Sequence, residues 1–298
     1  MSKIIYLADI DNPKYSFFKD IEAELKKGNE VEVINDRAFD AQTLVEKCAT
    51  ADMLLFHHGG VYTDTAINFA MSLERIKQIL QMVKCKKVCW FLDKVWFLNN
   101  STIEDIAPLT DLILLNDDTW ARRHKYENVK TLRCGTPDVK EGEENEKYKC
   151  LVSYYGEVFG FTEPYLKAMK KAFGRKFKVF SNVYGKELAD LVKSSKFVFV
   201  PVQPNDEFYW SHKIYEILAL GGCPIFPRLY GLQDEGFVSG EHYLGYKHPQ
   251  EIKAMVEGTE DTSDIIKAGK KLVKKYTYAN RVKELLKLCN QQSVSAKV

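Results

Sequence analysis

The sequence predicts an α/β fold in which two parallel-sheet domains face each other across a cleft. Short apolar runs alternate with longer amphipathic runs along most of the 298 residues, as expected for strands and helices of covered parallel sheets. A charged, turn-rich segment at residues 136–149 interrupts this alternation, which then starts again. A chain of this length is about right for two domains of ordinary size.

The elements of the first half follow one another in a regular order. Apolar runs predict strands at residues 3–9, 30–36, 52–60, 86–93, 111–117 and 129–135. Amphipathic runs predict helices at residues 14–28, 41–51 and 66–85. We therefore expect residues 1–138 to form a Rossmann-like N-terminal domain, and residues 139–149 to form a linker.

The second half repeats the pattern. It predicts strands at residues 150–156, 176–182, 196–202 and 223–228. It predicts helices at residues 162–174, 185–195, 211–222, 249–258 and 262–292. We expect a second Rossmann-like domain over residues 150–280 and a closing helix over 281–298. Because ligands of parallel sheets bind beyond the carboxyl ends of strands, site residues should directly follow the strands.

Composition narrows the class of protein. Hydrophobic residues make up 45% and charged residues 28%, which is typical of a soluble globular chain. A net charge of +2 argues against a protein whose whole surface is basic and binds nucleic acid. No apolar run approaches the roughly 18 residues of a membrane span, and the N-terminus does not read as a signal peptide. Seven irregularly spaced cysteines match no zinc pattern and suggest reduced thiols in a cytoplasm.

The segment "SHKIYEILALGGCPIF" at residues 211–226 carries the main candidate site. Ser211 is a good N-cap, so the first turn of the helix could hold an anion, with Lys213 beside it. Glu216 lies one turn deeper, where a carboxylate could accept hydrogen bonds from a ribose diol. The alternative is an amphipathic helix with an exposed Glu–Lys pair. Gly221 and Gly222 should end the helix.

This segment, with "GFVSGEHYLGY" and "YTYANRVKELL" downstream, resembles the donor-binding half of GT-B glycosyltransferases of group 1, including the spore-protein-like transferases. The resemblance covers roughly residues 150–290. It implies that Glu216 holds the ribose of a nucleotide and that Lys213 and Ser211 contact its diphosphate. Gly156 falls at the family's glycine turn beneath the phosphates. Tyr155 and His212 adjoin these residues and complete the expected donor site.

The resemblance implies a metal-independent transfer of a sugar from a nucleotide-diphosphate sugar, a UDP-sugar above all, to an acceptor hydroxyl. The nucleotide sugar is a co-substrate, and no cofactor or metal is expected. The acceptor would be a saccharide, an envelope polymer or modified DNA. Many members place a first glutamate where this chain has Phe208, and the usual Arg or Lys after the first strand of the second domain is missing. Two alternatives therefore stay open, a non-catalytic nucleotide-sugar-binding scaffold and a transferase that modifies nucleic-acid bases.

Candidate catalytic residues follow strands of the first, acceptor-binding domain. Asp9 and Asp11 follow the first strand. Three interpretations are open for them: acids that face the acceptor, ligands of a metal ion, or residues that simply form a turn. His58, in "HHGG", and Asp93, at the end of "CWFLD", are candidate bases for an acceptor hydroxyl. The alternative for "HHGG" is a loop with one buried, satisfied histidine.

Two basic runs stand apart from these sites. Residues 167–178 and 267–276 are rich in Lys and Arg. Most such runs are solvated helix faces, but beside a cleft they could receive a polyanionic acceptor. The dinucleotide glycine fingerprint, the P-loop, the Gly-x-Ser-x-Gly elbow and HExxH are absent from the sequence.

Overall fold

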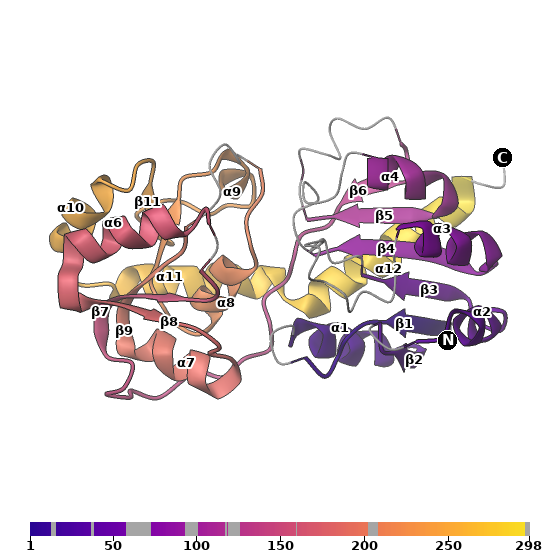
Figure 1. Cartoon of the computed structure of the whole chain (residues 1–298), viewed down its shortest axis with the longest axis horizontal. Coiled ribbons are helices and arrows are strands. Elements are labelled where there is room, and N and C mark those ends of the chain that lie inside the picture. Colours follow the sequence, from indigo (N-terminus) through magenta and orange to yellow (C-terminus); the bar gives the residue numbers. More distant parts are fainter. Residues whose placement is uncertain are drawn as a thin grey trace. The chain divides into compact units, whose positions relative to one another are not determined.

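The chain divides into two compact units, both built on parallel sheets (Figure 1). The first comprises residues Met1–Cys134 with Tyr278–Val298, and the second Gly135–Thr277. The computed structural model describes residues 1–12, 16–36, 39–57, 73–92, 101–116, 118, 126–158, 160–201 and 208–295.

The first unit contains a parallel sheet in the order β2-β1-β3-β4-β5-β6. Its strands are β1 (Lys3–Leu7), β2 (Glu30–Ile34), β3 (Met53–Phe56), β4 (Lys86–Phe91), β5 (Leu112–Leu115) and β6 (Val129–Thr131). The four central strands β1, β3, β4 and β5 are almost wholly buried, as expected for a parallel sheet covered on both faces.

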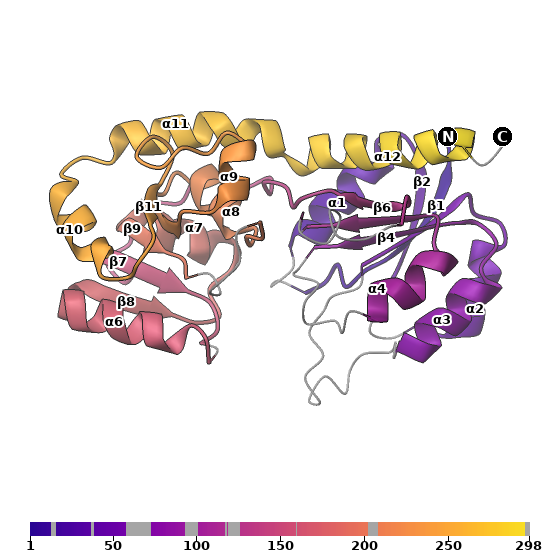
Figure 2. The same ribbon diagram turned by 90° about the horizontal axis from the view of Figure 1, so that it is seen from above.

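Helices cover both faces of this sheet (Figure 2). They are α1 (Phe17–Lys26), α2 (Ala41–Cys48), α3 (Leu73–Met82), α4 (Ser101–Ile106), the 3-10 turn η3 (Ala107–Leu109) and α12 (Tyr278–Ser295). Side chains alternate along each strand, so Ile4 packs with α1 and α12 while Ile5 packs with α2, α3 and α4.

The second unit holds a parallel sheet in the order β11-β10-β9-β7-β8. Its strands are β7 (Cys150–Tyr155), β8 (Phe177–Phe180), β9 (Ser195–Phe199), β10 (Pro224–Pro227) and β11 (Leu244–Tyr246). The strand β8 therefore forms one edge of the sheet, and β7, the first strand of the unit, lies inside it.

The helices of the second unit again form two layers. They are α6 (Glu163–Phe173), η4 (Gly174–Lys176), α7 (Gly185–Ser194), α8 (Lys213–Ala219), α9 (Tyr230–Asp234), α10 (Glu251–Gly258), α11 (Ser263–Val273) and η5 (Lys274–Tyr276). One core joins α7 and α8 to Tyr155 of β7. The other joins α6 and α10 to the neighbouring Tyr154. The two tyrosines thus face opposite sides of the sheet.

The segment expected to be a linker packs into the second unit. Tyr148 is buried in its core. The backbone N–H of Glu143 donates to Asp190 at 2.9 Å. A Cβ at Gly142 would lie 2.1 Å from the carbonyl carbon of Ala189, so only glycine fits there. Charge and turn residues suggested a solvated connection, but these contacts are made with α7, far along the sequence.

The C-terminal helix also differs from the single long helix expected at residues 262–292. The chain leaves α11 through η5 and starts α12 at Tyr278. The helix α12 packs on α1 of the first unit, with Val282 and Leu285 in the shared core. The last helix therefore completes the first unit. Among the described residues, no helix combines the length and apolarity needed to span a bilayer.

Candidate functional site

The helix α8 carries the candidate site and begins two residues later than Ser211. Its N-cap is His212, whose side chain makes no capping hydrogen bond. The helix therefore begins one residue later than a cap at Ser211 would place it, because the carbonyl of His212 accepts the first helical hydrogen bond, from the backbone N–H of Glu216 at 3.1 Å. The helix has only seven residues, and Gly221, with φ of +77°, follows its end as expected.

Lys213 reaches back to the end of β7. Its Nζ donates a hydrogen bond to the carbonyl oxygen of Tyr155 at 2.7 Å. The same ammonium lies 4.6 Å from the ring centroid of Tyr155 and 5.2 Å from that of Tyr154. Both distances are within the range of cation–π attraction. The two aromatic rings and the carbonyl therefore hold the positive charge at the carboxyl end of β7.

Gly156 makes room for this ammonium. The residue directly follows β7 with φ of +123°, a conformation that favours glycine. A Cβ at this position would lie 2.7 Å from the Nζ of Lys213. The backbone N–H of Gly156 donates to the carbonyl of Phe180 at the end of β8, 3.0 Å away. The backbone angle therefore favours glycine here, and any larger residue would also push the ammonium of Lys213 from its present position.

Glu216 is anchored on the same strand end. The hydroxyl of Tyr155 donates a hydrogen bond to Oε2 of Glu216 at 2.7 Å. Burial raises the pKa of Tyr155 well above its usual range, and the nearby Glu216 charge raises it further. The phenol therefore keeps its proton and acts as the donor. Both Glu216 and Lys213 turn toward β7, rather than forming only the exposed pair that helical spacing allowed.

The residues expected in the donor site are therefore largely brought together. Tyr155 contacts both the lysine through its carbonyl and the glutamate through its hydroxyl. This places a cation suited to phosphate and an acceptor suited to a sugar diol about one helical turn apart. Ser211 and His212 precede α8 and are half-buried, as are Lys213, Glu216 and Gly156.

Sequence reasoning missed the residues that support this arrangement. Tyr154 supplies one of the two rings near Lys213, and the pair of tyrosines before Gly156 was the available signal. Behind α8, the indole N–H of Trp210 donates to the hydroxyl of Tyr215 at 3.1 Å, and that hydroxyl donates to Glu235 at 2.7 Å. No local pattern marks this network, because Glu235 lies 20 residues from Tyr215.

In the first unit, Asp9 lies just beyond β1 and is buried, whereas Asp11 is exposed. The backbone N–H of Asn12 donates to the carbonyl of Asp9, which is consistent with a turn. The other candidate bases, His58 and Asp93, lie outside the described residues. Among the described residues, no group of three or more His, Cys, Asp or Glu side chains gathers as a metal site.

His57, the described histidine of "HHGG", is a core residue. Its Nδ1 lies 2.9 Å from the carbonyl oxygen of Trp90 and must donate to it. Its Nε2 therefore accepts from the hydroxyl of Tyr6, also at 2.9 Å. Burial lowers the pKa of His57 to about 4. The imidazole is neutral and fully bonded, as the alternative interpretation of this motif anticipated.

This histidine predicts an acid-sensitive first unit. The unfolded chain binds a proton at His57 near pH 6.5, but the folded chain only near pH 4. Its contribution is thus fully present above about pH 6.5 and is lost as pH falls toward 4, by up to about 3 kcal/mol. We expect His57→Gln to flatten this part of the profile in urea unfolding at a series of pH values. An unchanged profile would contradict the assignment.

Comparisons with known proteins find similarity to glycosyl transferases in the second half of the chain. Residues 162–287 match the family model for glycosyl transferase-like domains, a range that includes all of α8. The chain carries a glycosyl transferase-like domain. A search of curated proteins found no match. The expected group 1 family and the expected glycosyltransferase class are supported by this glycosyl transferase-like domain.

Solved structures confirm the GT-B architecture around the glycosyl transferase-like domain. One is an alpha-glucosyltransferase in complex with UDP and a 13-mer DNA containing a HMU base, at TM-score 0.68, 10% identity, and coverage of 96% of this chain and 99% of that chain. Another is an alpha-glucosyltransferase in complex with UDP-glucose and DNA containing an abasic site. Its TM-score is 0.66 at 10% identity, and the match covers 96% of this chain and 98% of that chain. A proposed UDP-N-acetylglucosamine 2-epimerase from Listeria monocytogenes has a TM-score of 0.56 at 9% identity, and the match covers 96% of this chain and 94% of that chain. These identities establish the fold alone.

Proposed function

We propose that this protein transfers a sugar from a nucleoside diphosphate sugar, with a UDP-sugar as the preferred donor, to an acceptor hydroxyl. The observation that carries the proposal is the double anchoring of Lys213 and Glu216 on Tyr155, beside Gly156. The carboxylate of Glu216 would accept hydrogen bonds from the ribose hydroxyls. The ammonium of Lys213 would face the diphosphate, whose charge grows as the sugar leaves.

The chemistry assigned to these residues needs no metal. Lys213 would stabilise the departing diphosphate by its charge, and Gly156 would let the phosphates approach the backbone. The proton of the acceptor would pass to a base of the first unit, for which Asp9, Asp11, His58 and Asp93 are the candidates. We place the reaction in the cytoplasm, where the seven thiols would stay reduced.

We favour a hydroxyl on a modified nucleic-acid base as acceptor over a saccharide or an envelope polymer. Two of the structural neighbours are alpha-glucosyltransferases in complex with DNA. Their likeness extends over nearly the whole length of both chains. A non-catalytic scaffold with the same fold would bind the donor but leave it intact.

A thermal-shift screen against UDP-, GDP-, ADP- and CMP-sugars tests the donor. A donor at a hundred times its Kd stabilises the protein by about 2.7 kcal/mol, so the melting temperature should rise by several degrees. We expect the largest rise with a UDP-sugar. Slow release of UDP without acceptor should accompany it. A rise without UDP release would favour the scaffold, and the absence of any rise would refute donor binding.

A further inference from the structure

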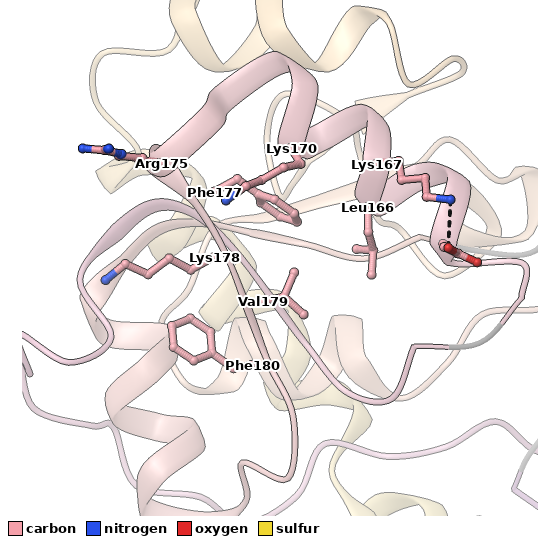
Figure 3. Close-up of a pocket in the computed structure, with 9 residues that line it drawn as sticks. Leu166, Lys167, Lys170, Arg175, Phe177, Lys178, Val179 and Phe180 are labelled. Carbon is pink, nitrogen blue, oxygen red and sulfur yellow. Dashed lines mark ion pairs between the residues drawn. The ribbon is translucent and has the colours of Figure 1, made fainter.

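A basic groove runs along the edge of the second sheet, between α6 and β8 (Figure 3). Its apolar lining includes Leu166 and Phe177, which are buried, and Val179, which is 44% exposed. Four of its lining residues are basic and one is acidic, and the basic ones are Lys167, Lys170, Arg175 and Lys178. Four of the six cations in the basic run at residues 167–178 therefore line this groove.

The charges of this groove are only partly balanced. Its acid, Glu163, forms an ion pair with Lys167 at 2.8 Å, which leaves the other three cations. Within the described part of the chain, Lys170, Arg175 and Lys178 form no ion pair with an acid. In Figure 3 the side chains of Arg175 and Lys178 extend toward the same side of the view. The groove thus carries a net charge of about +3 on its own residues, which suits a ligand with several negative charges.

The groove ends next to the candidate donor site. Phe180 lines it and is the last residue of β8. The carbonyl of Phe180 accepts the hydrogen bond from the backbone N–H of Gly156. The edge strand that forms one wall of the groove therefore leads directly to the glycine beside Lys213. A chain-like anion that occupied the groove would have one end near the site of sugar transfer.

An added peptide strand is a poorer fit than a phosphate chain. The strand β8 has only four residues, and the charged Lys178 lies on it. Short edge strands with lysine are typical of edges protected from strand addition. Phosphodiester chains instead bind through Lys and Arg along a groove and tolerate an apolar floor, because sugars and bases present apolar faces.

We propose that this groove holds the sugar-phosphate backbone of the nucleic acid whose base is modified. The inference rests on the proposed function for the identity of the acceptor. It adds the surface of the second unit that binds this acceptor. Lys170, Arg175 and Lys178 supply the phosphate contacts. Such contacts fix position without reading sequence, so the grip would be the same for any base sequence.

The test is the binding of a fluorescein-labelled DNA duplex of mixed sequence, without donor, followed by anisotropy at several salt concentrations. The variant Lys170→Ala/Arg175→Ala/Lys178→Ala should bind roughly 10- to 100-fold more weakly at low salt. The slope of log K against log salt should fall by about 2 to 3, since each phosphate contact contributes about 0.9. Its melting temperature and its donor-induced shift should match those of the unchanged chain.

A matched control removes three positive charges elsewhere on the same unit. The variant Lys149→Ala/Lys247→Ala/Lys253→Ala should bind DNA nearly as tightly as the unchanged chain, because these exposed lysines lie outside the groove. The proposal would be overturned if the two variants lost DNA affinity equally. It would also be overturned if polyglutamate competed as well as DNA at the same concentration of negative charge. Because the donor is absent from the binding assay, a failure here is distinct from a failure of donor binding.

Discussion

A Glu216→Gln variant is expected to bind a UDP-sugar roughly 10- to 100-fold more weakly than the unchanged chain while it keeps nearly the same melting temperature. Glutamine retains an amide oxygen that can accept the hydrogen bond from the hydroxyl of Tyr155, which the structure places on Oε2 of Glu216. It loses the charge that strengthens hydrogen bonds from ribose hydroxyls, each of which contributes about 1.5 to 3 kcal/mol with a charged acceptor and about 0.5 to 1.5 kcal/mol with a neutral one. Calorimetric titration with a UDP-sugar measures the affinity.

Alanine would test this position less cleanly. It would leave the buried hydroxyl of Tyr155 without Glu216, at a cost of about 1 to 3 kcal/mol in stability. A loss of binding in Glu216→Ala would therefore mix a direct and an indirect effect. Glu257→Gln, on an exposed face of α10, is the matched control and should change neither affinity nor stability. If Glu216→Gln bound the UDP-sugar with unchanged affinity, the assignment of Glu216 to the ribose would be wrong.

A Lys213→Met variant is expected to release UDP from the donor about 100- to 1,000-fold more slowly, with a smaller effect on donor affinity. Methionine preserves an unbranched apolar chain against Tyr154 and Tyr155 but removes the ammonium that Tyr155 holds at 2.7 Å. Loss of one preorganised group at a developing negative charge typically costs this much in rate. Steady-state release of UDP, in the presence and absence of acceptor, measures it.

Arginine at the same position separates charge from geometry. The ammonium is a compact charge whose Nζ donates to the carbonyl of Tyr155 at 2.7 Å. A planar guanidinium on a longer side chain cannot place its charge at the same point, so Lys213→Arg should recover little of the lost rate. Lys149→Met, at an exposed position, should behave like the unchanged chain. If Lys213→Met released UDP at the normal rate, the diphosphate would have to be stabilised by other groups.

Local patterns in the sequence were sufficient for much of the fold. Alternating apolar and amphipathic runs predicted both parallel sheets, because a strand buried on both faces and a helix buried on one have different hydrophobic periods. The double glycine after α8 predicted where that helix ends, since Gly221 adopts a positive φ. The same segment pointed to Lys213, Glu216 and Gly156, whose types suit phosphate and ribose.

Contacts between distant segments had to be read from the tertiary structure. Local pattern marked residues 139–149 as a solvated linker, but Gly142 packs on the backbone of α7, a contact that no local window contains. The helical spacing of Lys213 and Glu216 is the same whether the two side chains face solvent or turn toward β7. The hydrogen bond from Tyr155, 61 residues before Glu216, is what turns the glutamate toward β7. His57 is likewise a neutral core residue because Tyr6 and Trp90 close around it. Sequence fixes which groups a chain carries, whereas burial and partners, which come from folding, determine what each group can do.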